Sequence, residues 1–300
     1  MSSSGATAGT PVAEHVIDEE LVAGLLAEQH PDLAALPLRN VDAGWDNAMF
    51  RLGETQVVRL PRRADAAGLI VHEQRWLPHL ASRLTLPIPV PERVGFPACG
   101  YPWHWSIHRW LPGAAADEFP PAPEQAIPFA AFLRSLHAPA PSDAPRNPVR
   151  GCPLAERAPV AEERLRRLSE RTNVITRRLR RVWSLALEAP IDVAPTWLHG
   201  DLHPRNVLVE RGVITGIIDW GDISAGDRAT DLAAIWMLFD DASARRAALS
   251  AYGELSQATL ARARGWAVHL GATLLDTGLV DNPRLARIGE LTLRRLDAGE

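Results

Sequence analysis

The sequence of 300 residues contains no lysine, and all 32 of its Lys or Arg positions are arginine. A Schiff base with pyridoxal phosphate or an aldehyde requires a lysine amine, so this chemistry is excluded. The lysine of a Walker phosphate-binding loop is also missing, which excludes that class of NTPase. Such arginine usage fits a high-GC genome better than any requirement of folding.

The sequence also has few cysteines, no long apolar run and a small net charge. Cys99 and Cys152 have no metal-binding spacing, and we expect both to be free thiols in a reducing cytoplasm. No apolar run approaches the roughly 20 residues that a membrane span needs, and Met1–Pro11 lacks the apolar core of a signal peptide. The net charge of −4 gives no bulk basic field for nucleic acid. We therefore expect a cytoplasmic protein without a membrane or nucleic-acid partner.

The N-terminal third alternates between helical and strand-like patterns. After a predicted disordered tail over residues 1–15, Asp18 caps an amphipathic helix that ends near His30. Residues 36–61 have the pattern of three short strands with tight connections, which predicts an antiparallel meander. The remaining predicted elements are a helix over 65–82 and strand-like pieces over 92–96 and 103–110.

The rest of the chain is predicted to be mostly helical. A segment rich in Pro, Ala and Asp over 114–123 indicates a boundary. We predict an α+β protein with a β-rich N-lobe over 16–110 and a helical C-lobe over 111–300. The arginines of 164–181 fit a solvated helix face, with a nucleic-acid patch as the alternative. The predicted helices cover 125–137, 155–188, 228–239, 242–256, 258–276 and 282–297, and short strands and loops cover 196–222.

Three polar residues of this strand-and-loop block have the spacing of a phosphotransfer site. Asp201 and Asn206 stand in a loop that leads into an apolar strand, and Asp219 follows a second apolar strand. A turn near residues 210–212 makes the two strands a hairpin, which would bring Asp219 beside Asn206. Amide and carboxylate oxygens there suit Mg²⁺ bound to substrate phosphates. Asp201 would then accept the proton of a hydroxyl or orient it.

This arrangement of Asp-x4-Asn and Ile-Asp-x-Gly is the layout of the protein-kinase fold, and the sequence resembles the aminoglycoside phosphotransferase family. Residues 199–208 (HGDLHPRNVL) are similar to the family's catalytic loop, and 217–222 (IIDWGD) stand where protein kinases have D-F-G. Residues 226–233 match a third family segment, with Arg228 where proline is usual. The resemblance runs over most of the chain from Leu38. It implies a protein-kinase-like two-lobe fold with ATP or GTP and Mg²⁺ as cofactors.

The resemblance also implies a phosphate-pairing residue in the N-lobe. Arg59 stands at the position of the kinase lysine on the third strand, and arginine can pair with phosphate oxygens through its fork of N–H groups. Glu73, fourteen residues further on, is its expected partner. Outside this context the two side chains would form no more than a surface salt bridge of about 0–1 kcal/mol.

Further nucleotide contacts are implied at two other segments. Residues 106–113 match the hinge whose backbone binds a purine edge, which includes His108 and Trp110. The turn of the hairpin that covers the nucleotide would be formed by Gly44, Trp45, Asp46 and Asn47, a G-W-D-N sequence typical of antibiotic kinases.

The remaining candidates surround the catalytic loop. The resemblance implies that His199 and Asp231 brace this loop, although Asp231 also fits a helix N-cap, and His199 with His203 is a weak zinc pattern without further ligands. His203 lies nearer the expected substrate, and Asp222 is either a second metal contact or a solvated loop carboxylate. Two tryptophans of the C-lobe, Trp236 and Trp266, are candidates for lining the acceptor cleft.

The sequence therefore predicts a small-molecule kinase that transfers the γ-phosphate of ATP or GTP to a hydroxyl. The preferred acceptor is an antibiotic such as an aminoglycoside, with a macrolide or a metabolic small alcohol or amino acid as alternatives. A catalytically silent, kinase-like nucleotide-binding protein is the alternative of another class, although Asp201, Asn206 and Asp219 are all present. We expect a monomer.

Overall fold

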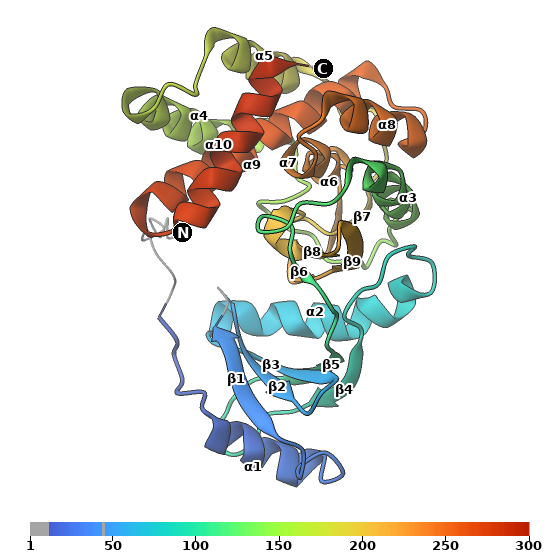
Figure 1. Ribbon diagram of the computed structural model, residues 1–300, viewed down its shortest axis with the longest axis vertical. Coiled ribbons are helices and arrows are strands. Elements are labelled where there is room, and N and C mark those ends of the chain that lie inside the picture. The colour runs from blue at the N-terminus through green and yellow to red at the C-terminus, as the bar shows by residue number, and fades with distance from the viewer. Residues whose placement is uncertain (1–11, 44–45, 300) are drawn as a thin grey trace. The chain divides into compact units, whose positions relative to one another are not determined.

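The structure is a computed structural model that describes residues 12–43 and 46–299. The chain divides into two compact units. One contains the chain up to Ser82 together with Pro87–Leu111, and the other contains Arg83–Leu86 and the chain from Pro112 onward. The first is built on an antiparallel sheet and the second is mainly helical, so the fold is α+β as predicted (Figure 1).

The N-terminal unit holds a five-stranded antiparallel sheet in the order β1-β2-β3-β5-β4. The predicted meander is confirmed as its first three strands, and the predicted Asp18 cap is confirmed by the Leu21 N–H, which donates to the carboxylate at 2.9 Å. The elements of this unit are α1 (Glu19–Gln29), β1 (Leu38–Ala43), β2 (Asn47–Leu52), β3 (Gln56–Pro61), α2 (Ala64–Ala81), β4 (Pro91–Gly95) and β5 (Trp105–Arg109).

The two faces of this sheet differ in chemistry because side chains alternate along β3. Val58 and Leu60 are fully buried in an apolar cluster that includes Leu25 and Leu26 of α1. Arg59 points to the opposite face, toward Glu73 of α2. The apolar face holds the unit together, and the other face carries a buried ion pair.

The predicted disordered tail over residues 1–15 extends too far along the chain. Residues 1–11 lie outside the described residues, but Glu14 and His15 contact the sheet unit. The Glu14 N–H donates to the Arg62 carbonyl at 2.9 Å, and the His15 ring contacts the edge of Trp103 at 5.0 Å between centroids. Glu14 and His15 therefore belong to the folded N-terminal unit.

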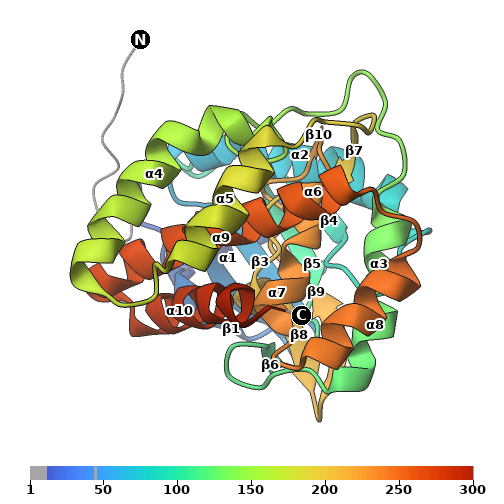
Figure 2. The ribbon, with the colours of Figure 1, turned by 90° about the horizontal axis from the view of Figure 1, so that it is seen from above.

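The C-terminal unit is organised around the long helix α9, which packs against α4, α5, α6 and α10 (Figure 2). Its elements are β6 (Ala114–Ala115), η1 (Pro123–Gln125), α3 (Ala126–Leu136), α4 (Leu154–Arg171), α5 (Arg177–Glu188), β7 (Thr196–Leu198), η2 (Pro204–Asn206), β8 (Val207–Glu210), β9 (Val213–Ile217), β10 (Ser224–Gly226), α6 (Ala229–Leu232), α7 (Ala234–Leu238), α8 (Ala242–Tyr252), α9 (Gln257–Asp281) and α10 (Pro283–Ala298).

Two predicted helices are each divided in the structure. The segment 155–188 forms α4 and α5, and the Thr176 side chain accepts a hydrogen bond from Leu179 N–H, which caps the second helix. The segment 228–239 forms the short helices α6 and α7, separated at Ala233. Periodicity located the apolar faces but not these interruptions, since Thr172–Thr176 has no glycine or proline.

Both cysteines are free, Cys99 at an exposed position and Cys152 partly buried. Across residues 12–43 and 46–299, no helix has the length and apolar character to cross a membrane.

Candidate active site

The loop between β7 and β8 carries the predicted catalytic residues. The expected hairpin is confirmed, because β8 and β9 pair antiparallel with Val207 opposite Ile217. The Ile218 N–H donates to the Asn206 carbonyl at 2.9 Å, so Asp219 follows directly beside Asn206. Asp219 has a φ of 61°, in the left-handed region that asparagine and aspartate tolerate better than most residues.

Buried polar contacts hold this loop. The Asp231 carboxylate is inaccessible to solvent and accepts hydrogen bonds from the N–H groups of His199 at 2.7 Å and Gly200 at 2.9 Å. His199 Nδ1 accepts from the Asp201 N–H at 3.3 Å, and Nε2, which carries the ring proton, donates to the Ile218 carbonyl at 2.9 Å. The loop is thereby fixed to α6 on one side and to the end of β9 on the other.

The position of Asp231 excludes the alternative role as a helix N-cap. It lies inside α6, whereas the Ala229 N–H at the start of the helix donates to Asp227 Oδ1 at 3.1 Å. Asp227 is in turn paired with Arg262 of α9 at 2.6 Å, and both side chains are buried. Asp231 therefore binds the backbone of the catalytic loop, whereas Asp227 binds the first N–H group of α6.

Gly200 is required by its surroundings. Its φ is 88°, and a Cβ atom built on it would lie 2.6 Å from the Asp222 carbonyl oxygen. Any side chain would therefore strain the backbone and collide with it. The glycine lets the segment that contains Asp222 lie against the catalytic loop.

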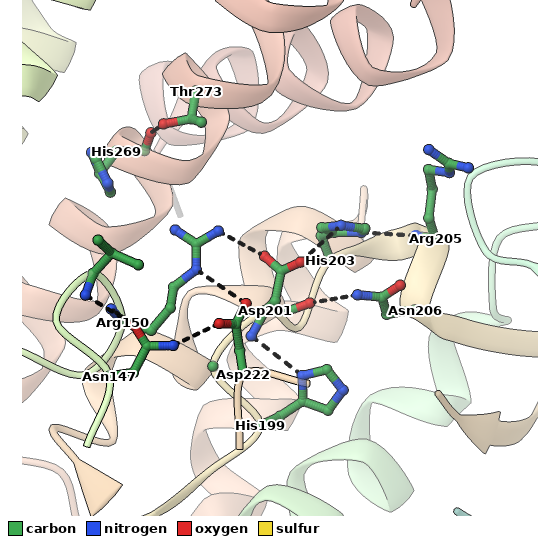
Figure 3. Close-up of polar contacts among 12 residues, drawn as sticks. Asn147, Arg150, His199, Asp201, His203, Arg205, Asn206, Asp222, His269 and Thr273 are labelled. Carbon is green, nitrogen blue, oxygen red and sulfur yellow. Dashed lines mark hydrogen bonds and ion pairs between the residues drawn. The ribbon is translucent and has the colours of Figure 1, made fainter. Parts of the chain in front are cut away.

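Asp201 is held by the side chains of Arg150 and His203. Arg150 Nη2 lies 3.0 Å from its Oδ1, and His203 Nε2 lies 3.4 Å from its Oδ2 (Figure 3). Burial alone would raise the pKa of this carboxyl, but His203 and Arg150 outweigh burial and hold it well below its usual range. Asp201 is therefore ionised at neutral pH.

Asp222 is the second carboxylate beside Arg150. It lies 4.0 Å from Arg150 Nε and accepts a hydrogen bond of 2.6 Å from Asn147 Nδ2. Burial and the nearby Asp201 charge raise its pKa. Asn147 also accepts hydrogen bonds from the N–H groups of Val149 and Arg150, so it links the loop over residues 137–153 to this carboxylate.

The described residues fit a magnesium ion at Asn206 and Asp219. Asn206 Nδ2 donates to the Asp201 carbonyl at 2.9 Å, which leaves its side-chain oxygen as an acceptor. That oxygen and the neighbouring Asp219 carboxylate are hard ligands, and Mg²⁺ commonly takes one or two such protein ligands plus substrate phosphates. Among the described residues no group of three or more His, Cys, Asp or Glu forms a metal cluster.

In the N-terminal unit the structure places Arg59 against Glu73. Their side chains form two hydrogen bonds, of 2.6 and 3.3 Å, at a position where Arg59 is 6% and Glu73 1% exposed. The expected pairing is present, and it is buried rather than a surface salt bridge. A buried, hydrogen-bonded pair of this kind fixes the orientation of the guanidinium.

The two predicted hinge residues, His108 and Trp110, have different surroundings. His108 is fully buried, with Nδ1 2.6 Å from the Pro89 carbonyl. The Trp110 N–H donates to the Thr55 carbonyl at 2.7 Å, and its ring is covered by the Arg51 guanidinium at 4.2 Å. Both side chains therefore have structural contacts, and a purine edge would have to be bound by other backbone groups of the segment.

The G-W-D-N turn is only partly described. Gly44 and Trp45 lie outside the described residues. Asp46 forms a salt bridge of 2.6 Å with Arg63, and Asn47 begins β2 opposite Pro61. Arg63 is therefore part of this turn and is not a free surface arginine.

Comparison with known proteins identifies the family. The sequence profile of the phosphotransferase enzyme family (APH) matches residues 37–266. The chain belongs to the phosphotransferase enzyme family. A curated relative in Bacillus subtilis (strain 168), the uncharacterized protein YcbJ, is 24% identical over 65% of this chain and 66% of its own length. The match with this chain thus spans just under two thirds of that relative's length.

Solved structures of similar fold include aminoglycoside and macrolide phosphotransferases. An APH(2″)-IIIa complex with GDP and kanamycin aligns with a TM-score of 0.67 at 20% identity, over 93% of this chain and 99% of that one. The macrolide 2′-phosphotransferase MphH from Brachybacterium faecium aligns with a TM-score of 0.58 at 23% identity, over 94% and 99%. At these identities the likeness establishes the kinase-like fold of this phosphotransferase.

The assignment of Trp236 and Trp266 to the acceptor cleft is wrong in this structure. Trp236 is 1% and Trp266 0% exposed, and both rings are packed within the C-terminal unit. Trp266 packs edge-on against His269 of α9, with ring centroids 5.6 Å apart. Both tryptophans belong to the core that supports the loop.

The residue that sequence reasoning missed is Arg150. It lies 51 residues before Asp201 in a loop without a recognisable motif, and its pairing depends on how that loop crosses β10. The Gly151 carbonyl accepts a hydrogen bond from Asp227 N–H at 2.9 Å, and a Cβ on Gly226 would lie 2.5 Å from the same oxygen. The only signal in the sequence was an arginine between Pro148 and Gly151, which is common in loops.

Proposed function

We propose that this phosphotransferase moves the γ-phosphate of ATP or GTP to a hydroxyl group of a small molecule. The observation that carries the proposal is the fixed position of the ionised Asp201, between Arg150 and His203 and next to Asn206 and Asp219. Such a carboxylate can accept the proton of an attacking hydroxyl.

The transfer forms one bond and breaks one. The acceptor oxygen attacks the γ-phosphorus, and the bond from that phosphorus to the β–γ bridging oxygen breaks, which releases the nucleoside diphosphate. The hydroxyl proton passes to the Asp201 carboxylate. Asn206 and Asp219 would hold Mg²⁺, which supplies neutralisation of phosphate charge.

Arg59 is the proposed phosphate-pairing residue of the N-terminal unit. Its guanidinium is oriented by Glu73, and arginine retains its charge at all accessible pH values. Burial of the pair strengthens the attraction to phosphate oxygens, since water does not screen it there.

Antibiotics are the first acceptors to examine, because similar structures carry kanamycin or macrolide names. A polycationic aminoglycoside, however, requires carboxylates without internal partners. Asp240 is hydrogen-bonded to Arg295. Asp276 is paired with Arg164 and Arg167. Asp231 is buried and binds the backbone of the catalytic loop. These three carboxylates are therefore already paired or buried, which counts against an aminoglycoside site built on them.

The experiment compares Asp201→Asn with the parent protein. Each is supplied with ATP or GTP and Mg²⁺ and a panel of aminoglycosides, macrolides, small alcohols and hydroxy acids, and products are identified by mass. Because proton acceptance contributes about 10²–10⁴-fold, we expect Asp201→Asn to lower kcat by that factor at an unchanged fold. Asp240→Asn, which changes a carboxylate that is 76% exposed, is the matched control.

Two results would oppose the proposal. Transfer by Asp201→Asn at the parent rate would remove Asp201 from catalysis. Nucleotide binding without product from any acceptor would favour the silent, kinase-like alternative.

A further inference from the structure

A row of arginines on α4 faces a row of polar residues on α9. Arg164 Nη1 donates to Thr273 Oγ1 at 3.2 Å, and Arg167 pairs with Asp276. Arg157 stands two turns before Arg164 on the same helix, and His269 stands one turn before Thr273. The two helices pack against each other.

The charge along this row is balanced at one end only. Arg164 and Arg167 share the Asp276 carboxylate. Among the described residues, by contrast, no carboxylate lies within salt-bridge distance of Arg157 and no hydrogen bond reaches its guanidinium. The unbalanced end of the row is therefore the end that contains Arg157.

Arg150 connects this end to the proposed catalytic carboxylate. Figure 3 shows its guanidinium directed to Asp201 and Asp222, with His269 of α9 beyond it. Arg150, Arg157 and Arg164 all act electrostatically on His269. Burial first, and then these three arginines, lower the His269 pKa to about 3, so the ring is neutral.

Three buried nitrogen atoms in this region have no hydrogen-bond partner within the described parts of the chain: Arg150 Nε, Arg157 Nε and His269 Nδ1. His269 is 1% exposed. Unsatisfied buried polar groups are unfavourable. An acceptor oxygen would satisfy the N–H groups of the two arginines, and that of His269 in the tautomer that carries its proton on Nδ1. The α4 helix also begins here at Leu154, and no side chain of residues 12–43 or 46–299 caps this end, which favours negative charge.

We propose that Arg150, Arg157 and His269 form a subsite for an anionic group of the acceptor, a carboxylate or a phosphate. The proposal rests on the proposed phosphotransferase function and names its substrate class: a hydroxyl compound that carries a negative charge. Its reacting hydroxyl binds at Asp201 and its anionic group binds on the α4 side of Arg150. Arg157, which has no counter-ion among the described residues, supplies the charge that recognises the anion.

The first test measures binding of two simple anions, acetate and inorganic phosphate. The melting temperature is recorded with a saturating non-hydrolysable ATP analogue and Mg²⁺, so that phosphate cannot occupy the nucleotide site. We expect a saturable rise of the melting temperature by about 2–4 °C with at least one anion. The anion that gives the larger rise shows whether the subsite prefers a carboxylate or a phosphate.

Two variants of α4 assign the effect. Arg157→Gln should lose the rise, whereas Arg166→Gln, which changes an arginine 57% exposed on the same helix, should retain it. Without anion, Arg157→Gln should melt at or above the parent temperature, because it removes a part-buried charge that no described carboxylate pairs with. A lower melting temperature together with no anion effect in the parent would make Arg157 a structural residue and overturn the proposal.

The second test compares three acceptors that share the hydroxyl groups of C2–C6 and differ at C1: gluconate has a carboxylate there, glucitol a further hydroxyl and 1-amino-1-deoxyglucitol an amine. We expect phosphorylated product with the carboxylate compound in preference to the amine, and a KM raised at least about 10-fold in Arg157→Gln with kcat within about threefold. Preference for the amine would overturn the subsite.

The two proposals fail separately. Saturable anion binding that depends on Arg157, combined with no transfer to any acceptor, would leave the subsite in place and oppose the phosphotransferase function. Transfer to neutral or cationic acceptors without anion binding would do the reverse.

Discussion

At the scale of single residues, Arg59 and Glu73 show how burial changes what a substitution measures. Both side chains are almost inaccessible, and each compensates the charge of the other through the hydrogen bonds of 2.6 and 3.3 Å. Removing one partner leaves a buried charge, whereas removing both does not. A change at Arg59 therefore alters stability, apart from any effect on the nucleotide binding proposed for this residue.

We predict that Arg59→Ala lowers the free energy of unfolding by about 3–5 kcal/mol. The double variant Arg59→Ala/Glu73→Ala should lose less, because neither buried charge of the pair remains. Urea unfolding of the parent, both single variants and the double variant measures the coupling. Arg39→Ala, at an exposed position of β1, is the control, and additive losses for Arg59 and Glu73 would contradict a coupled pair.

A buried histidine gives a pH dependence at the same scale. Burial, followed by the Arg59 charge, lowers the His108 pKa to about 3, against an ordinary value of 6.5. Between these values the unfolded chain binds a proton that the folded chain does not, so stability falls as the pH decreases from 6.5 toward 3. At about 1.36 kcal/mol per pH unit, the cost at pH 5 is about 2 kcal/mol.

The variant His108→Asn should reduce this loss, because its side-chain amide can still donate to the Pro89 carbonyl and does not titrate. Urea unfolding at pH 7 and at pH 5 gives the comparison. His79→Asn, which changes an exposed histidine, should leave the pH dependence as in the parent. An identical pH dependence in both variants would show that His108 is not the group responsible.

At the scale of elements, the loop over 199–206 is positioned by contacts from several directions. Asp231 binds its backbone from α6, the end of β9 binds His199, and Asp222 lies against Gly200. These contacts hold Asp201 in place, and they require that Gly200 keeps its positive φ.

We predict that Gly200→Ala destabilises the protein by about 2–5 kcal/mol, the sum of about 1–2 for the backbone strain and about 1–3 for the collision with Asp222. Gly100→Ala separates the two causes. Gly100 has a φ of 77°, but a Cβ added to it would have no atom of the described residues within 4 Å, so only the strain should remain. Thermal unfolding measures both, and equal losses would show that the close approach has no effect.

The sequence predicted elements and motif positions well, and long-range pairing poorly. Asn206 and Asp219 are joined by a hairpin, so their approach follows from strand length and turn position. Arg150 reaches Asp201 through the path of an irregular loop, which no periodicity encodes. Trp266 was misplaced because an aromatic residue on a helix has the same pattern whether it lines a cleft or the core.

At the scale of the whole molecule, the absence of lysine provides an unusually clean chemical background. A kinase-like fold ordinarily places a lysine amine at the phosphates, and here the guanidinium of Arg59 stands on the corresponding strand. Any lysine introduced by substitution becomes the only side-chain amine of the chain. A modified side-chain amine can then be assigned to that lysine.

We predict that Arg59→Lys makes the protein reactive toward 5′-fluorosulfonylbenzoyl adenosine, an adenosine analogue whose sulfonyl fluoride modifies amines near the phosphate position. Lysine retains the charge that compensates Glu73, so the variant should remain folded, although the second hydrogen bond is lost. One modification per chain is expected by mass, and ATP with Mg²⁺ should prevent it. Arg39→Lys carries an equally unique amine on the exposed part of β1 and should not be modified in an ATP-dependent way. Equal, ATP-insensitive modification of both variants would show that Arg59 does not lie at the nucleotide phosphates.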